Sequence, residues 1–328
     1  RKGGGVLELD MPERRVVLGE DGNVVRMETR PRLDSHRLIE EFMIAANVAA
    51  AETLERLKQP CMYRIHDAPA AEKMEALRQF LDSLGLGLAK GQVTKPDHFN
   101  RILAKVRGGP NERMVNEIVL RSQAQAEYSP ANIGHFGLAL GRYCHFTSPI
   151  RRYADLLVHR ALIGGLKLGQ GGPEPVTGED AGMGTHLSQT ERRAVAAERG
   201  AVDRFTAAFL ADRVGARFAA RVNGVTRFGL FVTLDEVGGD GLVPLGTLPD
   251  DHYVHDAGRH VLRGRRTKRE YRLGDEVEVI LAEAEPLTGG LILHLLSGQG
   301  EAGGKRRRAG KGRAAAKGGA SRRRKIRR

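Results

Sequence analysis

Two adjacent arginines, Arg151 and Arg152, lie near the middle of the chain, where a helix is expected to begin. Ser148 is a favourable capping residue, a proline follows it, and the apolar spacing predicts a helix over residues 149–162. A helix dipole disfavours cations in its first turn. Two guanidiniums beside free backbone N–H groups therefore indicate an anion site, most simply for a phosphodiester. Alternatively, Asp155 pairs with one arginine on a solvated face, and the local sequence leaves both interpretations open.

A pair of glutamates is the second chemical feature, in a helix predicted over residues 36–57. This helix is apolar over most of its circumference, so we expect it to be buried inside a large domain. Glu40 shares a face with Asn47, whereas Glu41 lies above apolar residues. A carboxylate on an apolar face needs a partner or a chemical role. Taken alone, the residues favour a structural ion pair with an arginine.

The segment from His135 to Arg160 carries a long pattern without gaps. It contains H-F-G-L-A-L, then Y-x-H-F-T-S-P-I-R-R-Y-x-D-L, and it closes on H-R. This pattern resembles the signature of the RNase II/R family of exoribonucleases. The resemblance implies an RNB-type catalytic domain that degrades RNA from single-stranded 3′ ends, processively, to nucleoside 5′-monophosphates. Whether structured RNA is also a substrate stays open at this point. It also implies hydrolysis with a divalent metal, which we expect to be Mg²⁺.

The resemblance implies roles for the residues around the two arginines. Arg151 is expected to grip the scissile phosphate and to stabilise the negative charge that develops there. Ser148, Arg152 and Tyr153 are expected to contact the RNA and to orient this phosphate.

The same resemblance assigns two glutamates. The family carries the pattern E-E-x-M-I-x-A-N, in which one glutamate contacts the nucleotide next to the scissile phosphate. We assign this role to Glu41, with Glu40 as the second candidate. The family pattern A-E-R-x-x-x-D falls at Glu198, in a long helix predicted over residues 187–214. Glu198 is therefore expected to lie near the catalytic channel and to contact RNA, although such a charged face is normally only solvated.

Residues 215–297 predict a second domain. Its five short strands, with a long connection before the fourth, fit an oligonucleotide-binding (OB-fold) barrel. The strands are expected over residues 217–226, 228–234, 241–244, 276–284 and 291–296. The patterns V-x-x-V-T-R-F-G-L-F-V-x-L and G-L-V-P-L resemble those of S1-type RNA-binding domains.

Two phenylalanines, Phe228 and Phe231, would offer faces on which RNA bases stack, at about 1–3 kcal/mol per base, although a single phenylalanine more often packs in a core. Arg227 would add positive charge beside them. Pro244 stands where many S1-type domains carry a histidine, so one common RNA contact is missing. The run R-G-R-R-T-K-R, residues 263–269, falls in the long connection and is a plausible RNA-binding loop.

The charge of the chain is concentrated at its C-terminal end. The formal net charge is +13 at pH 7, and residues 302–328 hold 13 Lys and Arg without an acid, which equals the whole excess. We expect residues 298–328 to form a disordered tail that binds polyanions without sequence preference. Solubility or a nonspecific attraction to the ribosome would explain this tail equally well.

The length of 328 residues suits about two domains. We expect residues 1–214 to form an α+β portion of a catalytic domain, followed by the all-β five-stranded barrel and the tail. Strands are expected over residues 6–9, 14–18, 24–28, 62–67 and 132–146, and further helices over 70–84, 96–106 and 111–127. No apolar run is long enough to span a membrane, two cysteines suit a reducing cytoplasm, and the resemblance suggests a monomer.

The metal ligands of the family do not occur in this sequence. Hydrolysis with two metals needs carboxylates that hold the ions roughly 4 Å apart. The family supplies them from D-x-x-x-x-x-D-x-D-D, and this sequence lacks that pattern. We therefore expect the chain to be the C-terminal portion of such a nuclease, without metal ligands and inactive in isolation. The alternative is a non-catalytic RNA-binding or ribosome-associated module that uses the barrel and the tail.

Overall fold

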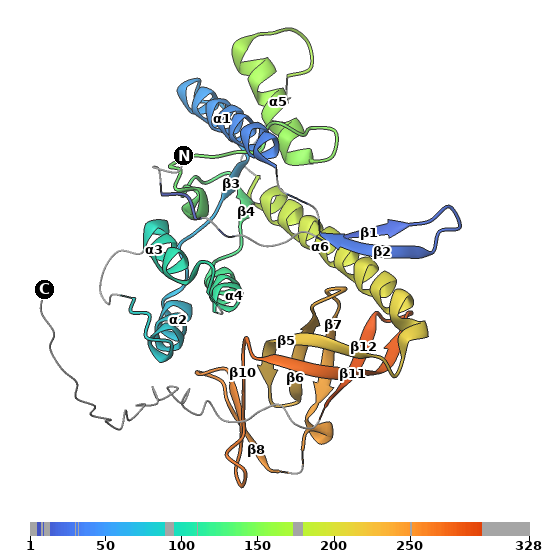
Figure 1. The fold of residues 1–328 in the computed structure, drawn as a ribbon. Coiled ribbons are helices and arrows are strands. Elements are labelled where there is room, and N and C mark those ends of the chain that lie inside the picture. Colours follow the sequence, from blue (N-terminus) through green and yellow to red (C-terminus); the bar gives the residue numbers. More distant parts are fainter. Residues whose placement is uncertain are drawn as a thin grey trace, which may run out of the picture.

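The computed structural model describes residues 5–7, 9, 14–29, 31, 33–88, 95–109, 111–172, 180–249 and 251–296. Figure 1 shows a helical part and a β-barrel, joined by the long helix α6 (Asp180–Leu210). The predicted fold class, an α+β part followed by a five-stranded barrel, is confirmed. Within these ranges, no helix combines the length and the apolar character that a membrane span requires.

The helical part contains two packed groups of helices. One core holds α1 and α5 together, and another is formed by α2, α3 and α4. The bounds are α1 Asp34–Arg56, α2 Ala71–Ser83, α3 Pro96–Val106, α4 Glu112–Ser122 and α5 Tyr153–Leu166. The two short strands β3 (Tyr63–Ile65) and β4 (Glu127–Ser129) pair antiparallel. Helix α4 ends five residues before its predicted end, because Glu127 pairs with Ile65 and so belongs to β4.

The predicted strand over residues 132–146 is wrong. This segment makes only isolated bridges, such as Tyr63 with Cys144, and a short 3-10 turn, η1 (Phe136–Leu138), capped by the side chain of His135. Glycines recur along it, and Gly134 has φ +81°, a conformation that interrupts a regular strand. Among residues 6–9, the three that the structure describes are not in a strand either. The predicted tail, residues 298–328, lies outside the described residues.

Helix α1 is buried over only part of its length. Asn47, Ala50, Ala51 and Leu54 are buried where α1 packs against α5. The first half of the helix instead exposes large apolar side chains, including Phe42, which is 65% exposed. The prediction of burial along the whole helix is therefore wrong for its first half, where the described part of the chain provides no packing partner.

Helix α6 connects the two parts of the molecule (Figure 1). Near its start, the Ser188 hydroxyl accepts the backbone N–H of Tyr128 at 2.9 Å, and Glu191 forms a bidentate ion pair with Arg64 at 2.6 and 3.1 Å. Its other end packs on the barrel and beside the hairpin of β1 (Arg14–Leu18) and β2 (Val24–Thr29). Between these contacts, residues 192–199 are exposed on every side, so this stretch of α6 crosses solvent.

The barrel closes in the strand order β11-β12-β7-β6-β5. All its pairings are antiparallel except that between β12 and β7. Its strands are β5 (Arg217–Thr226), β6 (Gly229–Leu234), β7 (Asp240–Pro244), β11 (Glu276–Glu285) and β12 (Gly290–Leu295). Alternate residues of β5 are buried, and this period of two is the pattern that made the strands predictable.

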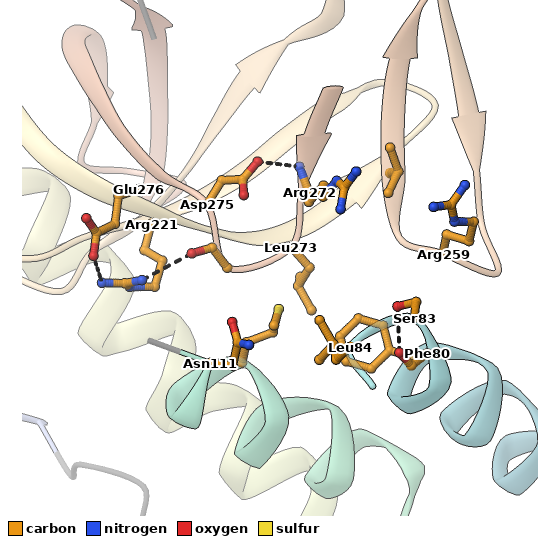
Figure 2. A pocket seen from close by; sticks show the side chains of 13 residues that line it. Phe80, Ser83, Leu84, Asn111, Arg221, Arg259, Arg272, Leu273, Asp275 and Glu276 are labelled. Atoms are coloured by element: carbon orange, nitrogen blue, oxygen red, sulfur yellow. Dashed lines mark hydrogen bonds and ion pairs between the residues drawn. The ribbon is translucent and has the colours of Figure 1, made fainter. Parts of the chain in front are cut away.

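The connection before β11 is not a simple loop. It forms a three-stranded antiparallel sheet of β8 (Tyr253–Asp256), β9 (Val261–Gly264) and β10 (Glu270–Arg272). This sheet and the start of β11 pack against α2 and α4, because Leu273 joins the core of the helices and His260 contacts the ring of Phe80. A pocket of about 400 Å³ opens between them (Figure 2). Inside it, Arg221 is already bonded to Glu276, at 2.6 Å, and to the carbonyl of Gly274.

Candidate functional site

The segment that carries the two arginines is organised by one buried carboxylate. Asp155 is fully buried and accepts the backbone N–H of Ser148 at 2.7 Å and two N–H groups of Arg152, each at 2.8 Å. These bonds hold residues 148–152 in a separate turn, which we call the arginine turn, so α5 begins at Tyr153. The predicted start at Pro149 is therefore wrong, because a carboxylate three to seven residues downstream captures the groups that would have entered the helix.

The two arginines consequently differ in what they can do. Arg152 forms the ion pair with Asp155 that the sequence left open as the structural alternative. Arg151 is exposed and, in the part of the chain that the structure describes, its side chain forms neither a hydrogen bond nor an ion pair. Its guanidinium thus presents all its donors to solvent beside Ser148. A planar fork of this kind matches the geometry of a phosphate.

Helix α1 holds the same segment from the other side. The Asn47 side chain donates to the Tyr143 hydroxyl at 2.9 Å and accepts the backbone N–H of Phe146 at 2.9 Å. The thiol of Cys144 donates to the Asn47 carbonyl at 3.3 Å. On the α5 side, His159 stacks on the Phe146 ring, with 4.3 Å between ring centroids. Because these partners lie up to 99 residues apart, sequence patterns do not reveal them.

A buried hydroxyl in this segment lacks a partner. Among the described residues, the Thr147 hydroxyl oxygen is buried and makes no hydrogen bond within the protein. Buried polar atoms are nearly always satisfied, so such an atom marks a place for a ligand or a water molecule. The local sequence does not reveal this feature, because a threonine beside a helix start is normally only a capping residue.

A histidine beneath the segment is kept neutral. The Tyr128 hydroxyl and His145 Nδ1 are 2.8 Å apart. Burial, followed by the charges of Arg152 and Arg64, lowers the pKa of His145 to about 3. Burial also lowers the pKa of His135 to about 3, with smaller contributions from His66 and Arg64. Because both imidazoles are neutral at pH 7, they add no positive charge near the arginines. The charge that this segment exposes to solvent is then that of Arg151.

These two histidines predict an acid-sensitive fold. A histidine has a pKa of about 6.5 in the unfolded chain, so between pH 6.5 and 3 the unfolded state binds more protons than the folded state. Stability should therefore fall as the pH drops below about 6.5, by about 2 kcal/mol at pH 5 for each imidazole. Urea denaturation at pH 7 and pH 5 measures this loss. A His145→Gln variant, whose side chain cannot be protonated, should lose about 2 kcal/mol less than the wild type; an unchanged loss would contradict the assignment.

The predicted glutamates lie on the two long helices. Glu40 is half-buried and Glu41 is exposed, both one to two turns before Asn47 on α1. Both glutamates make contacts within the protein. Glu198 is exposed on the stretch of α6 that crosses solvent. Direct contact of Glu41 and Glu198 with RNA stays a prediction.

The barrel exposes the predicted aromatic residues. Phe228 and Phe231 are 63% and 42% exposed, and the guanidinium of Arg227 lies over the Phe228 ring, 4.7 Å from its centroid. Gly229 makes this arrangement possible: its φ is +145°, and a Cβ there would lie 2.1 Å from the Val243 carbonyl oxygen. Each exposed ring offers a face on which a base can stack.

The described ranges contain no group of three His, Cys, Asp or Glu side chains that could hold a metal ion. The divalent metal implied by the family resemblance therefore does not fit the residues that the structure describes.

Comparison with known proteins places the chain in a family. A model of the RNB domain matches residues 1–167, half of the chain. The chain belongs to the RNB domain family. The RNB match includes the arginine turn and its buried Asp155, and a model of the S1 RNA binding domain matches residues 211–295, which form the barrel and the β8–β10 sheet.

Relatives of this RNB protein share both parts. Ribonuclease R of Aquifex aeolicus is 42% identical over 275 residues, which cover 84% of this chain and 39% of that protein. Apo RNase R of Mycoplasma genitalium has a TM-score of 0.80 at 28% identity, over 90% of this chain and 47% of that one. The same enzyme solved with ribose methylated single-stranded RNA gives a TM-score of 0.79 at 28% identity, with the same coverage. The chain thus spans less than half the length of these relatives.

Proposed function

We propose that this chain is the RNA-gripping portion of a 3′→5′ exoribonuclease that hydrolyses RNA processively to nucleoside 5′-monophosphates. The proposal rests on the different surroundings of the two arginine side chains. Asp155 fixes Arg152 at 2.8 Å and thereby holds the turn, while the neighbouring Arg151 is left exposed and unpaired within the described structure. The ribonuclease R relatives at about 40% identity favour nuclease activity over a purely non-catalytic module.

In this proposal, Arg151 binds the scissile phosphate with two parallel N–H···O bonds. The guanidinium is always protonated, so it stabilises the negative charge that grows on the phosphate oxygens as the bond breaks. The Ser148 and Thr147 hydroxyls lie in the same turn, and the Thr147 oxygen has no other bond in the described part. They orient the phosphate, and Arg152 acts mainly by keeping the turn in shape.

The rest of the described chain guides the RNA to this turn. Bases stack on Phe228 and Phe231 of the barrel, and the strand runs along α6, past Glu198, towards Glu41 and Tyr153 on α1 and α5. Support comes from the M. genitalium relative, which was solved with single-stranded RNA. We further propose that hydrolysis requires Mg²⁺ and that the whole enzyme works as a cytoplasmic monomer, with some attraction to the ribosome.

The direction of degradation tests this proposal. The longer protein that contains this chain should convert single-stranded RNA labelled at its 5′ end into a short labelled end product, with few labelled intermediates. RNA labelled at the 3′ end should instead release labelled nucleoside 5′-monophosphate at once. RNA with a 3′-terminal phosphorothioate block serves as the control. Internal cleavage, or binding without any shortening, would contradict the proposal.

A further inference from the structure

The turn between β9 and β10 is a second concentration of positive charge. We call residues 264–269 the basic turn; it carries Arg265, Arg266, Lys268 and Arg269. The backbone N–H of Gly264 donates to the Arg269 carbonyl at 2.8 Å, and that of Arg265 donates to the His252 carbonyl at 2.8 Å. These bonds close the turn over the start of β8.

The carboxylate of Asp251 fixes the basic turn through several hydrogen bonds. Asp251 accepts the backbone N–H groups of Arg266 and Thr267, at 2.9 and 2.7 Å, and the Thr267 hydroxyl at 2.5 Å. It also accepts its neighbouring backbone N–H, that of His252, at 2.7 Å. These bonds, that of the Thr267 hydroxyl first, lower the pKa of Asp251. A Cβ at Gly264 would lie 2.4 Å from the same carboxylate, so the close approach requires glycine there.

The anchored turn presents cations that the protein leaves unused. Arg265 and Lys268 are exposed, and among the residues that the structure describes neither takes part in an ion pair. Lys268 adopts a φ of +59°, a conformation that a lysine takes at an energetic cost. The arginines on the adjoining strands differ, because Glu270 pairs with both Arg263 and Arg272.

The basic turn points away from the helices. At the opposite end of the same sheet, the turn between β8 and β9 carries His260, which packs against Phe80 of α2. Figure 1 shows the β8–β10 sheet outside the closed barrel, with one end directed away from the helical part. The basic turn is therefore open to a partner from solvent.

We propose that the basic turn is an RNA-backbone contact, separate from the aromatic face of Phe228 and Phe231, with Asp251 as the residue that positions it. This inference rests on the proposed RNA-binding function. The turn offers cations without an apolar anchor, whereas protein interfaces are anchored by buried aromatic and aliphatic side chains. Phosphates need only such cations, and a turn that is already rigid loses little entropy on binding.

Removal of two cations tests the contact. The Arg265→Ala/Lys268→Ala variant should bind a single-stranded RNA 20-mer roughly tenfold more weakly at 0.1 M salt. The slope of log K against log salt concentration should shrink by about 1.4, because each lost phosphate contact contributes ~0.7. The matched control is Arg101→Ala/Lys105→Ala, which removes two exposed cations one turn apart on α3. Fluorescence anisotropy at several salt concentrations measures both quantities, and equal affinities and slopes for the two variants would overturn the proposal.

The Asp251→Ala variant distinguishes a charge effect from a positioning effect, because the two predict opposite changes in RNA affinity. Charge alone predicts that Asp251→Ala strengthens RNA binding, because the variant removes a negative charge from the site. Positioning predicts weaker binding, because without the hydrogen bonds of Asp251 the turn no longer holds its cations in a fixed arrangement. Binding that is at least threefold weaker, with an unchanged melting temperature of the barrel, supports the proposal. Stronger binding would remove Asp251 from this role.

These outcomes are independent of nuclease activity. If the Arg265→Ala/Lys268→Ala variant binds RNA as the wild type does, the basic turn fails while the proposed nuclease stands. If the longer protein never shortens RNA but both tests above succeed, the nuclease fails and the contact stands. If the variant loses binding to an acidic peptide such as poly-glutamate as strongly as binding to RNA, the contact is general for anions and the assignment to RNA is overturned.

Discussion

Replacing Arg151 by alanine in the longer protein is expected to lower kcat by about 10²- to 10³-fold, which is the loss typical for removing one donor to a developing oxyanion. RNA affinity should change little, because the proposed contacts at Phe228, Phe231 and the basic turn also hold the strand. Arg151 has no structural partner in the described part of the molecule, so its removal should leave the fold intact. Single-turnover kinetics together with equilibrium binding of RNA separates the two effects.

Two further variants sharpen this prediction. Arg151→Lys keeps the charge but loses the two-pronged geometry, so it should restore only part of the activity. Arg101→Ala, on the exposed face of α3, removes one positive charge away from the arginine turn and should leave kcat unchanged. Unchanged turnover in Arg151→Ala would place this residue outside the active site.

Replacing Asp155 by alanine is expected to lower the free energy of unfolding by about 3–5 kcal/mol, as for other broken buried ion pairs. The substitution leaves the Arg152 guanidinium, only 20% exposed, without its counter-charge. It also leaves the backbone N–H of Ser148 without an acceptor. Urea denaturation of this chain at pH 7 measures the change.

The Arg152→Ala/Asp155→Ala double variant tests whether the loss comes from the pair. When both partners are absent, no uncompensated charge remains. The double variant should therefore lose about 1–3 kcal/mol less stability than the two single variants lose in sum. Asp212→Ala, an exposed acid near the end of the helical part, is the control and should change stability by less than about 0.5 kcal/mol. A loss that small in Asp155→Ala would show that the turn does not depend on this carboxylate.

The sequence predicted best those elements that depend on local patterns. The barrel strands follow from alternating burial, and β5 has the predicted bounds, Arg217–Thr226. Helix α3, Pro96–Val106, also has the predicted bounds, because its proline and its strong apolar periodicity act within one helix. The β8–β10 sheet was missed because its strands have only three or four residues, too few to show a period.

The sequence predicted which residues belong to the candidate site, but not how they are arranged. Local patterns gave the arginines and left open whether Asp155 pairs with them. The structure assigns the pair to Arg152, because the buried carboxylate also binds Ser148 and so moves the start of α5 to Tyr153. The grip of Asn47 on the turn depends on contacts between residues almost 100 positions apart, which carry no local signal.

We propose that this chain binds RNA but does not cleave it. The most direct test incubates the isolated chain with single-stranded RNA labelled at its 5′ end, with and without Mg²⁺, and follows binding and RNA length in the same sample. We expect salt-sensitive binding with RNA of unchanged length in both conditions. Mg²⁺-dependent shortening from the 3′ end by the isolated chain would contradict it, as would the absence of any binding.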